Sequence, residues 1–393
     1  MSHPLSPTLH TVQLGKSWFA PGSGGGLDRM FDGLLRHLPA AGVPSQGFVA
    51  GPRPSADVPA AIQGVGDETA SLVQRARGFR SAVRTALASS PADLVAAHFA
   101  LYAAPVLDLL DGRPLVCHFH GPWGLESAAE GDPGWKVRLK TAVETLVYRR
   151  AAHFIVLSEA FRDILETTYG VPPGRISIVP GGVELPRFAV DTSRAAARRR
   201  ISLPTDRPIA LSVRRLARRM GLETLIDAWT DVVARHPEAL LLIAGTGPLH
   251  DDLQAQIERL GLSRHVRLLG FVPDPSLPHL YRAADASVLP TVALEGFGLT
   301  TIESLAAGTP ALVTPVGGLP EVVRGLSDAL LLPDTSAPAL AHGVATAFSA
   351  PDRLPSAADC RAFVEAHYAW PAIAAQTARV YEQVAAPAVA AGA

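Results

Sequence analysis

The stretch that decides the fold reads Glu295-Gly296-Phe297-Gly298-Leu299-Thr300-Thr301-Ile302-Glu303. Glycine adopts positive φ angles without steric cost and lets a ligand approach the backbone, so the two glycines predict a tight turn. The residues after the turn predict a helix to about Ala307, because Gly308 and Pro310 are typical of positions at and beyond a helix C-terminus. Glu295 is therefore expected in the loop and Glu303 in the first turn of the helix, with both carboxylates facing one cleft.

The chemistry of this pair of carboxylates allows two interpretations. Ionised carboxylates accept hydrogen bonds and donate none, so Glu295 and Glu303 suit a ligand that carries many hydroxyl groups, with one acid for each sugar ring. In the structural alternative, Thr300 and Glu303 form a Ser/Thr-x-x-Glu capping box, and Glu303 then satisfies only the start of its own helix. On these residues alone the two interpretations stand side by side.

Segments on both sides of the stretch favour the binding interpretation. They are Ala284-Asp285 and Val288-Leu289-Pro290 before it, and Ala307-Gly308-Thr309-Pro310 and Thr314-Pro315-Val316-Gly317-Gly318 after it. With them, the region from about residue 280 to 323 resembles the donor-site region of the retaining glycosyltransferases of family 4, which carry a Glu-x7-Glu motif. The resemblance is continuous from about residue 115 to 388 and patchy up to about residue 110. It implies the GT-B fold, in which two Rossmann-like, doubly wound α/β domains face a cleft.

Length and composition are consistent with two domains. A chain of 393 residues, 48% of them apolar, is too long for one ordinary core. Strands that alternate with helices along both halves indicate α/β domains with parallel sheets. From the resemblance we expect an acceptor-side domain over residues 1–185, a donor-binding domain over residues 186–370, and a terminal helix over residues 371–388 that crosses back to the first domain. Residues 51–69 are rich in Pro, Gly, Asp and Ala and predict a loop.

The overall charge and the cysteine content exclude several classes of protein. A net charge of −1 gives no general attraction to nucleic acid. Cys117 and Cys360 are too few for a disulfide framework and suit a reducing cytoplasm. No apolar run has the length of a membrane span, and residues 1–8 lack the basic start and the apolar core of a signal peptide. These observations predict a cytoplasmic protein.

The residues of one predicted helix suggest a peripheral contact with a membrane. The helix expected over residues 135–150 begins with basic residues. Such a helix would dock on an anionic membrane, at its inner face, or on an anionic lipid-linked acceptor. An ordinary solvated helix face is the alternative.

Near the N-terminus a strand, a glycine-rich loop and a helix follow one another. The strand is expected over residues 9–14, the loop over residues 21–26 and the helix over residues 27–38. This order aims backbone N–H groups and a helix N-terminus at an anion, although a run of glycines is also typical of a mobile loop. The resemblance implies that Gly25 and Gly26 lie near the diphosphate of the donor.

Three histidines stand at the ends of two strands expected in the first half. His98 follows a strand over residues 93–97, and His118 and His120 lie at the end of a strand that starts at Leu115. In doubly wound sheets, ligands bind beyond the carboxyl ends of the strands, so His120 is expected to contact the donor sugar or the acceptor. No Glu or Cys completes a recognisable metal-ligand spacing, which argues against a metal site. Side chains satisfied by backbone groups are the structural alternative.

A basic turn opens the second half. The residues from Arg214 to Gly221 follow a predicted strand and resemble the family pattern Gly-Arg-Leu-x3-Lys-Gly. A phosphate site at such a turn requires cations. The resemblance assigns this role to Arg215, whereas Met220 stands where the family has its lysine. Arg219 or Arg218 is then expected to supply the second charge.

The resemblance implies that a sugar is transferred from a nucleoside diphosphate to a hydroxyl acceptor with retention of configuration. The expected catalytic residues are His120, Glu295 and Arg215, and Glu303 is expected to hold the ribose. The co-substrate is expected to be a UDP- or GDP-sugar that also contacts Gly25, Gly26, Arg215, Arg219, Val272, Gly296, Phe297, Gly298 and Leu299. No Asp-x-Asp motif stands in a suitable loop, so no obligatory metal is expected. The acceptor stays open between a glycolipid, a polysaccharide and a small metabolite.

Two alternatives come from other classes. A sugar-nucleotide-binding partner subunit with little activity would explain why Met220 replaces the lysine. A nucleotide-sugar 2-epimerase would use the same two-domain fold, and it differs from a transferase because it requires no acceptor.

Overall fold

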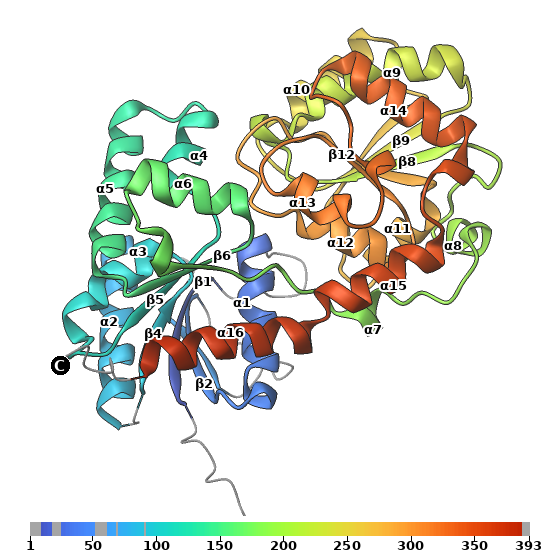
Figure 1. The fold of residues 1–393 in the computed structure, drawn as a ribbon. Helices are drawn as coiled ribbons and strands as arrows, with labels where there is room; N and C mark the ends of the chain where they lie inside the picture. Colours follow the sequence, from blue (N-terminus) through green and yellow to red (C-terminus); the bar gives the residue numbers. More distant parts are fainter. Residues whose placement is uncertain (1–8, 18–24, 52–60, 68–69, 90–91, 387–393) are drawn as a thin grey trace, which may run out of the picture. The chain divides into compact units, whose positions relative to one another are not determined.

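The chain forms two compact units, which we describe separately (Figure 1). Unit 1 takes in residues 1–128, 133–182 and 370–393, and unit 2 takes in residues 129–132 and 183–369. Each unit contains one parallel sheet, so the predicted α/β class with two doubly wound domains is confirmed. The computed structural model describes residues 9–17, 25–51, 61–67, 70–89 and 92–386.

Unit 1 contains a seven-stranded sheet in the order β3-β2-β1-β4-β5-β6-β7, in which all neighbouring strands are parallel. Strands β4 and β5 are buried at every residue, as expected for a parallel sheet with helices on both faces. The strands are β1 (Thr11–Ser17), β2 (Ser45–Ala50), β3 (Ile62–Val65), β4 (Leu94–Ala97), β5 (Leu115–Phe119), β6 (His153–Val156) and β7 (Ile176–Ile178).

Strand β3 lies within residues 51–69, where the sequence predicts a loop, and the prediction is wrong for residues 62–65. This edge strand pairs with β2, and only Ile62 and Val65 of its residues are buried. Gln63 and Gly64 between them break the regular alternation from which a half-buried strand is recognised. The strand therefore depends on its neighbour in the sheet rather than on its own pattern.

The helices of unit 1 begin and end close to the predicted positions. The helices expected over residues 27–38 and 135–150 are displaced by at most one residue at each end. The α-helices are α1 (Gly26–His37), α2 (Leu72–Ser89), α3 (Ala100–Ala103), α4 (Trp123–Ala129), α5 (Gly134–Arg150), α6 (Glu159–Tyr169) and α16 (Trp370–Ala385). Short 3-10 helices are η1 (Pro39–Ala41), η2 (Ala104–Leu109) and η3 (Pro173–Arg175).

The terminal helix α16 packs on α1 within unit 1 (Figure 1). The indole of Trp370 lies where a side chain at Gly33 would be, because a Cβ atom there would be 2.0 Å from the ring. One face of α16 is apolar and buried at helical spacing, as an amphipathic helix requires. The buried residues are Trp370, Ile373, Ala374, Thr377, Ala378, Val380 and Tyr381.

Unit 2 contains a five-stranded parallel sheet in the order β10-β9-β8-β11-β12. The strands are β8 (Ile209–Val213), β9 (Leu240–Ala244), β10 (Val266–Gly270), β11 (Ala286–Leu289) and β12 (Ala311–Val313). The α-helices are α7 (Leu185–Phe188), α8 (Arg194–Arg200), α9 (Leu222–Arg235), α10 (His250–Arg259), α11 (Leu277–Ala283), α12 (Leu299–Ala306), α13 (Leu319–Arg324), α14 (Ala337–Ser349) and α15 (Ala357–Tyr368). The 3-10 helices are η4 (Arg218–Met220), η5 (Asp328–Leu330) and η6 (Pro351–Arg353).

Each sheet has a point at which the order of its strands reverses direction. In unit 1 this switch point lies between β1 and β4, and in unit 2 it lies between β8 and β11. The connections from neighbouring strands leave in opposite directions there, which opens a crevice at the carboxyl ends of the strands, where doubly wound proteins bind ligands. These two places are therefore where the functional residues are to be sought.

Candidate functional site

The switch point of unit 2 holds a cluster built on Arg214. This arginine directly follows β8 and is only 8% exposed. Its guanidinium donates to the hydroxyl of Thr291, just after β11, and to the carboxylate of Glu295 in the following loop. The hydroxyl of Thr291 also donates to Glu295 over 3.4 Å. Two strand ends thus bring a buried cation and a carboxylate together.

The carboxylate of Glu295 is held in its charged form. Burial favours the neutral acid and would raise its pKa, but the charge and the hydrogen bond of Arg214 outweigh burial and lower the pKa below its ordinary value. Arg219 adds a second positive charge that lowers the pKa in the same direction. An ionised carboxylate accepts hydrogen bonds, so Glu295 keeps the chemistry expected of a group that binds hydroxyls.

The loop that carries Glu295 is fixed through its backbone. Leu294 has a φ of +53°, and its carbonyl accepts a hydrogen bond of 2.9 Å from Arg219. Gly317 has a φ of +56° and approaches so closely that a Cβ atom there would lie 1.9 Å from the carbonyl oxygen of Glu295. Only glycine fits this position without displacing the loop. The orientation of Glu295 therefore depends on two segments that are distant in sequence.

Helix α12 begins at Leu299, and its N-cap is Gly298, which has a φ of +84°. The capping box of Thr300 and Glu303 is wrong, because no side chain caps this helix and Glu303 lies beyond its first turn. Glu303 is 5% exposed and accepts a hydrogen bond of 3.0 Å from the hydroxyl of Tyr281. Its carboxylate is thus directed by a residue of α11 rather than by its own helix.

Other residues expected at the donor site occupy diverse positions in unit 2. Arg215 is exposed, Arg218 is exposed, and Met220 is buried. Of the two arginines considered as substitutes for the family lysine, only Arg219 is placed by the contacts described above, next to the Glu295 loop. Val272 is half-buried beyond the end of β10.

The remaining glycine-turn residues are mainly packing positions. Gly296 and Gly298 are buried, and Leu299 is half-buried at the start of α12. Phe297 is 3% exposed, and its ring lies 5.5 Å from that of Tyr368 in an edge-on contact. Its side chain therefore belongs to the core, and only its backbone is available to a ligand.

The sequence reasoning missed Arg214. The family pattern has glycine at this position, and the arginine in its place is the only local signal that could have identified it. Its partner Glu295 lies far along the chain and beyond a different strand, so no local spacing links them. The ion pair exists because β8 and β11 are neighbours in the sheet.

At the switch point of unit 1, Gly25 is the N-cap of α1 and Gly26 is its first residue. Most of the predicted glycine loop, residues 21–24, lies outside the described residues. The backbone N–H of Gly25 donates to the carboxylate of Asp28 over 3.3 Å. A phosphate bound at this helix start would therefore meet a negative charge, which opposes the attraction of the helix N-terminus.

Three histidines meet at the carboxyl ends of β4 and β5, His118 within the end of β5 and the other two beyond the strands. His98 and His118 are buried, and His120 is half-buried. Nδ1 of His98 lies 3.1 Å from Nε2 of His120, and Nε2 of His118 lies 2.6 Å from the hydroxyl of Tyr381 on α16. The sequence expectation that His98 and His120 end up together is therefore met within unit 1.

The geometry of the three rings does not suit a metal ion. Their nitrogen atoms lie within 4.8 Å of one another. The rings of His98 and His118, however, are stacked at a centroid distance of 4.2 Å and an angle of 11°. A metal lies close to the plane of each imidazole that binds it, so two stacked, nearly parallel rings do not point to a common ion. The histidines form a hydrogen-bonded network instead.

All three imidazoles are held neutral. Burial lowers the pKa of His98 and of His118 well below the ordinary value, and each is lowered further by the neighbouring histidine charge. Burial alone lowers the pKa of His120 to about 4. At neutral pH each ring consequently has one N–H donor and one nitrogen that accepts.

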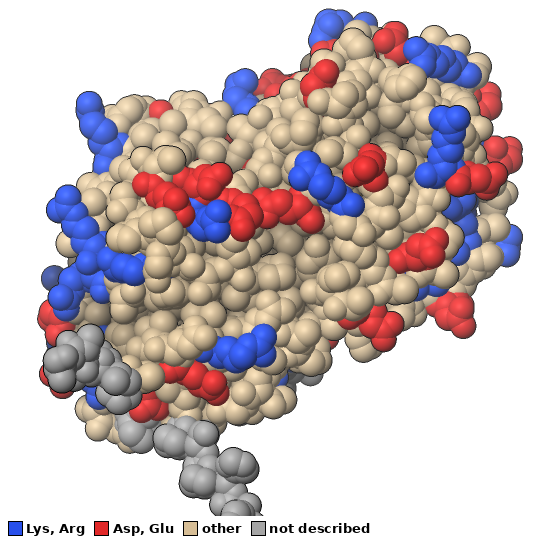
Figure 2. Space-filling model, in the orientation of Figure 1, with Lys and Arg blue, Asp and Glu red and all other residues tan. Residues whose placement is uncertain are grey.

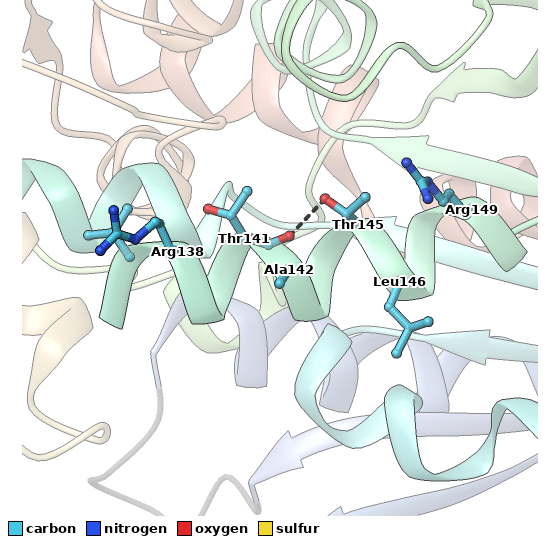
Figure 3. Close-up of a pocket in the computed structure, with 7 residues that line it drawn as sticks. Arg138, Thr141, Ala142, Thr145, Leu146 and Arg149 are labelled. Carbon is cyan, nitrogen blue, oxygen red and sulfur yellow. Dashed lines mark hydrogen bonds between the residues drawn. The ribbon is translucent and has the colours of Figure 1, made fainter. Parts of the chain in front are cut away.

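Helix α5 carries a shallow pocket that none of the predicted donor-site residues lines. Figure 3 shows Thr141 and Thr145 on one side of the helix and Ala142 and Leu146 on the other. The hydroxyl of Thr145 donates to the backbone carbonyl of Thr141 over 2.8 Å and is thus satisfied within the helix. The lining residues are Val137, Arg138, Thr141, Ala142, Thr145, Leu146 and Arg149.

Large apolar side chains are exposed along the same helix. Trp135, Leu139 and Leu146 are 61%, 59% and 54% exposed, and their spacing places them on one face. Figure 2 shows Lys and Arg side chains gathered at the edge of unit 1 along which α5 runs in Figure 1. No helix among the described residues is long and apolar enough to cross a bilayer.

Comparison with protein families gives matches to both parts of the chain. The family described as Glycosyltransferase Family 4 matches residues 24–187. The family described as Glycosyl transferases group 1 matches residues 193–366. The second match takes in the switch point of unit 2, the first match begins after β1 and takes in β4, and both descriptions are of glycosyltransferases.

Individual proteins agree with the family matches. D-inositol 3-phosphate glycosyltransferase 2 of Catenulispora acidiphila is 33% identical over 286 residues, which cover 69% of this chain and 66% of that protein. The chain spans between 40% and 66% of the length of the curated relatives it matches. Sucrose-phosphate synthase of Thermosynechococcus elongatus is 25% identical in sequence and superposes with a TM-score of 0.81, covering 95% of this chain and 99% of that chain.

A further solved structure shares the fold. The Anabaena protein HepE, determined in complex with UDP-glucose, superposes with a TM-score of 0.76 and covers 95% of this chain and 100% of its own. Its identity to this chain is 18%, so the similarity concerns the architecture of the sheets and helices.

Proposed function

Because the chain belongs to the glycosyltransferases of family 4, we propose that it transfers a sugar from a nucleoside-diphosphate sugar to a hydroxyl group of an acceptor, with retention at the anomeric carbon. The observation that carries the proposal is the cluster of Arg214, Thr291 and Glu295 at the β8/β11 switch point. It provides an ionised carboxylate where doubly wound sheets bind ligands. The family matches support the transferase class.

The donor sugar and the ribose are assigned to the two glutamates. Glu295 accepts hydrogen bonds from hydroxyls of the sugar, while Arg214 keeps it ionised and oriented. Glu303 accepts from the ribose hydroxyls, with the Tyr281 hydroxyl holding one of its oxygens in place. Val272 is the proposed neighbour of the nucleobase. The HepE complex with UDP-glucose supports a UDP-sugar, and a GDP-sugar is the second candidate.

The leaving diphosphate gains negative charge as the glycosidic bond breaks, and fixed cations and N–H dipoles stabilise such charge. We assign this role to Arg215 and to Arg219. The same role for the backbone of Gly25 and Gly26 requires that the carboxylate of Asp28 first releases the N–H of Gly25. In a retaining transfer without an enzymic nucleophile, the acceptor hydroxyl attacks on the side of the leaving group, and the diphosphate takes its proton. His120 contacts the donor sugar or the acceptor. The proposal includes no obligatory metal.

A binding and hydrolysis screen tests this function. The purified protein is melted with UDP-, GDP-, ADP- and dTDP-sugars, with and without Mg²⁺, because a ligand that binds the folded state raises the melting temperature. A metal-independent rise should disappear in Glu303→Ala and Arg215→Ala and persist in Arg259→Ala, an exposed arginine of α10. If no nucleotide sugar changes the melting temperature, the chain does not act as an independent transferase.

The same purified protein and nucleotide sugars distinguish a transferase from two other functions. A partner subunit with little activity, suggested by the buried Met220, would bind the donor without turnover when acceptors are supplied. A 2-epimerase would convert the donor sugar without an acceptor, whereas a transferase releases product only when a glycolipid, polysaccharide or small hydroxyl acceptor is present. Product analysis with and without acceptor distinguishes the three.

We also assign α5 to peripheral contact with an anionic membrane surface at the cytoplasmic side. The stripe of Trp135, Leu139 and Leu146 is apolar, and the exposed Arg138 and Arg149 on the same helix supply positive charge. Apolar burial combined with attraction to anionic lipid is what interfacial helices use. A membrane-bound transferase would then reach a lipid-linked acceptor.

Vesicle sedimentation tests this contact. Binding to vesicles containing phosphatidylglycerol should exceed binding to vesicles of phosphatidylcholine alone, and serine at positions 135, 139 and 146 together should abolish it. The matched control is Leu72→Ser with Val73→Ser on α2, two apolar residues that are 49% and 58% exposed. If both variants sediment equally with the anionic vesicles, α5 does not bind the membrane.

A further inference from the structure

A continuous chain of hydrogen bonds runs through unit 1 from a backbone carbonyl to His120. The hydroxyl of Ser45 donates to the carbonyl of Val43 over 3.0 Å. The hydroxyls of Ser45 and Thr11 lie 2.9 Å apart, and the amide nitrogen of Gln13 donates to Thr11 over 2.9 Å. The chain then passes from the Gln13 amide oxygen to Nε2 of His98, 3.1 Å away. It ends at His120.

The direction of every bond in this chain follows from its first member. A carbonyl oxygen can only accept, so the single proton of the Ser45 hydroxyl is committed to Val43. The Ser45 oxygen must then accept from Thr11, and the Thr11 oxygen must accept from Gln13. This fixes the orientation of the Gln13 amide, with its nitrogen toward Thr11 and its oxygen toward His98.

The same logic fixes the two histidines. The Gln13 oxygen accepts, so Nε2 of His98 carries the proton and donates. His98 is neutral, and its Nδ1 therefore has a lone pair that accepts from Nε2 of His120. His120 is neutral as well, so its remaining nitrogen, Nδ1, is also an acceptor. No described residue donates to that atom.

We propose that Ser45, Thr11, Gln13 and His98 are positioning residues that hold Nδ1 of His120 as a hydrogen-bond acceptor, so that it accepts a proton-donating hydroxyl of the sugar substrate. This inference rests on the proposed function for the identity of the ligand. A fixed acceptor selects a hydroxyl and rejects a group that cannot donate. It follows that a sugar bound at the switch point of unit 1 is recognised through one specific hydroxyl.

Position in the sheet supports this role. Thr11 and Gln13 lie on β1, the strand at the switch point, and His98 follows β4 on its other side. His98 is anchored again by its backbone N–H, which donates to the carbonyl of Leu14 over 2.8 Å. Ser45, Thr11, Gln13 and His98 are thus all buried, and His120 is half-buried with its Nδ1 atom turned away from solvent.

The first experiment reads the tautomers directly. Long-range ¹H–¹⁵N spectra of the full-length protein, labelled in histidine and assigned with His120→Asn and His98→Asn, should show protons on Nε2 of both His98 and His120. A proton on Nδ1 of either ring would overturn the proposal. This readout requires no substrate, so it fails or succeeds independently of the proposed function.

Variants of Gln13 test the cause. Gln13→Leu should let both histidines sample the other tautomer, whereas Gln13→Glu should leave them unchanged, because a carboxylate oxygen also can only accept. Tyr381→Phe removes a hydroxyl that touches Gln13 outside the chain and should leave the tautomers unchanged. If Gln13→Leu fails to fold, Ser45→Ala breaks the chain at its start with a smaller change. Unchanged tautomers in these chain-breaking variants would overturn the role of the chain.

A third experiment tests recognition of the substrate. It uses nucleotide sugars in which a single hydroxyl is replaced by fluorine, which cannot donate a hydrogen bond. With the nucleotide sugar found in the screen, one such replacement should lower kcat/KM roughly 3- to 10-fold, the range of one hydrogen bond. In Gln13→Leu this penalty should shrink, and in Gln13→Glu it should persist. A penalty equal in all three proteins would overturn the recognition step, whereas absence of turnover with every nucleotide sugar would overturn the proposed function.

Discussion

The guanidinium of Arg214 and the carboxylate of Glu295 form an ion pair at the point where β8 and β11 part. Their side chains are only 6% and 14% exposed, so solvent screens the pair little. Neither residue has an oppositely charged residue close to it in the sequence. The pair therefore links the architecture of the unit 2 sheet to the carboxylate that we assign to the donor sugar.

Replacing Arg214 should destabilise the protein strongly. Arg214→Met leaves Glu295 as an uncompensated buried charge, and we expect a loss of about 3–5 kcal/mol in the free energy of unfolding. Urea denaturation measures this loss. Arg215→Met, at the exposed neighbouring position, is the control and should change stability by no more than about 0.5 kcal/mol. Adding Glu295→Gln to Arg214→Met should recover part of the loss, because the unpaired charge is removed.

The three buried histidines should make stability depend on pH. In the folded state the pKa of His120 is lowered to about 4, and the pKa values of His98 and His118 are lowered well below the ordinary 6.5. Below pH 6.5 the unfolded chain therefore binds more protons than the folded chain. The contribution of these histidines to the free energy of unfolding is therefore complete above pH 6.5. It is lost as the pH falls below 6.5, by about 1.4 kcal/mol per pH unit for each histidine.

Urea denaturation between pH 4.5 and 7 measures the slope. His120→Asn should reduce it by the contribution of one proton, and the same substitution at the exposed His342 of α14 should leave it unchanged. A slope that His120→Asn does not alter would show that His120 binds the same number of protons in the folded and unfolded states.

Removing the Tyr381 hydroxyl should weaken the attachment of α16 in unit 1. Tyr381 is fully buried, and its hydroxyl bonds to His118 over 2.6 Å and to Gln13 over 3.2 Å. Tyr381→Phe removes this partner of the buried His118 and one of the contacts of Gln13, and we expect a loss of about 1–3 kcal/mol. Tyr368→Phe, whose hydroxyl makes one long bond of 3.5 Å, is the matched control with a smaller loss. Similar losses in thermal denaturation would contradict the expectation.

A glycine of α1 should resist replacement although it lies within a helix. Gly-to-Ala changes in helices usually stabilise by about 0.5–1 kcal/mol. At Gly33, however, the new Cβ atom would lie 2.0 Å from the indole of Trp370, so Gly33→Ala must displace α16 and should destabilise by about 1–3 kcal/mol. Gly134→Ala, in α5 with no atom within 4 Å of the new carbon, should be neutral or stabilising. Melting temperatures of the two variants decide the comparison.

The predictions from sequence were best where the pattern is local. Helices α1 and α5 begin and end within one residue of the expected positions, because their periodicity and their end signals lie within the segment itself. Strand β3 was not predicted, because its two buried residues form a strand only by pairing with β2. The Thr300–Glu303 capping box failed for a similar reason, because the left-handed Gly298 starts the helix and Tyr281 takes the carboxylate.

The sequence by itself determined the alternation of strands and helices, the class of fold, and the family, since these follow from periodicity and from short motifs read in order. Only the tertiary structure decided the partners of the functional groups. It joined Arg214 to Glu295 and linked Ser45, Thr11, Gln13, His98 and His120 into one directed chain. Hydrogen bonds act over about 3 Å, and in a parallel sheet the groups that come this close are brought together by the order of the strands.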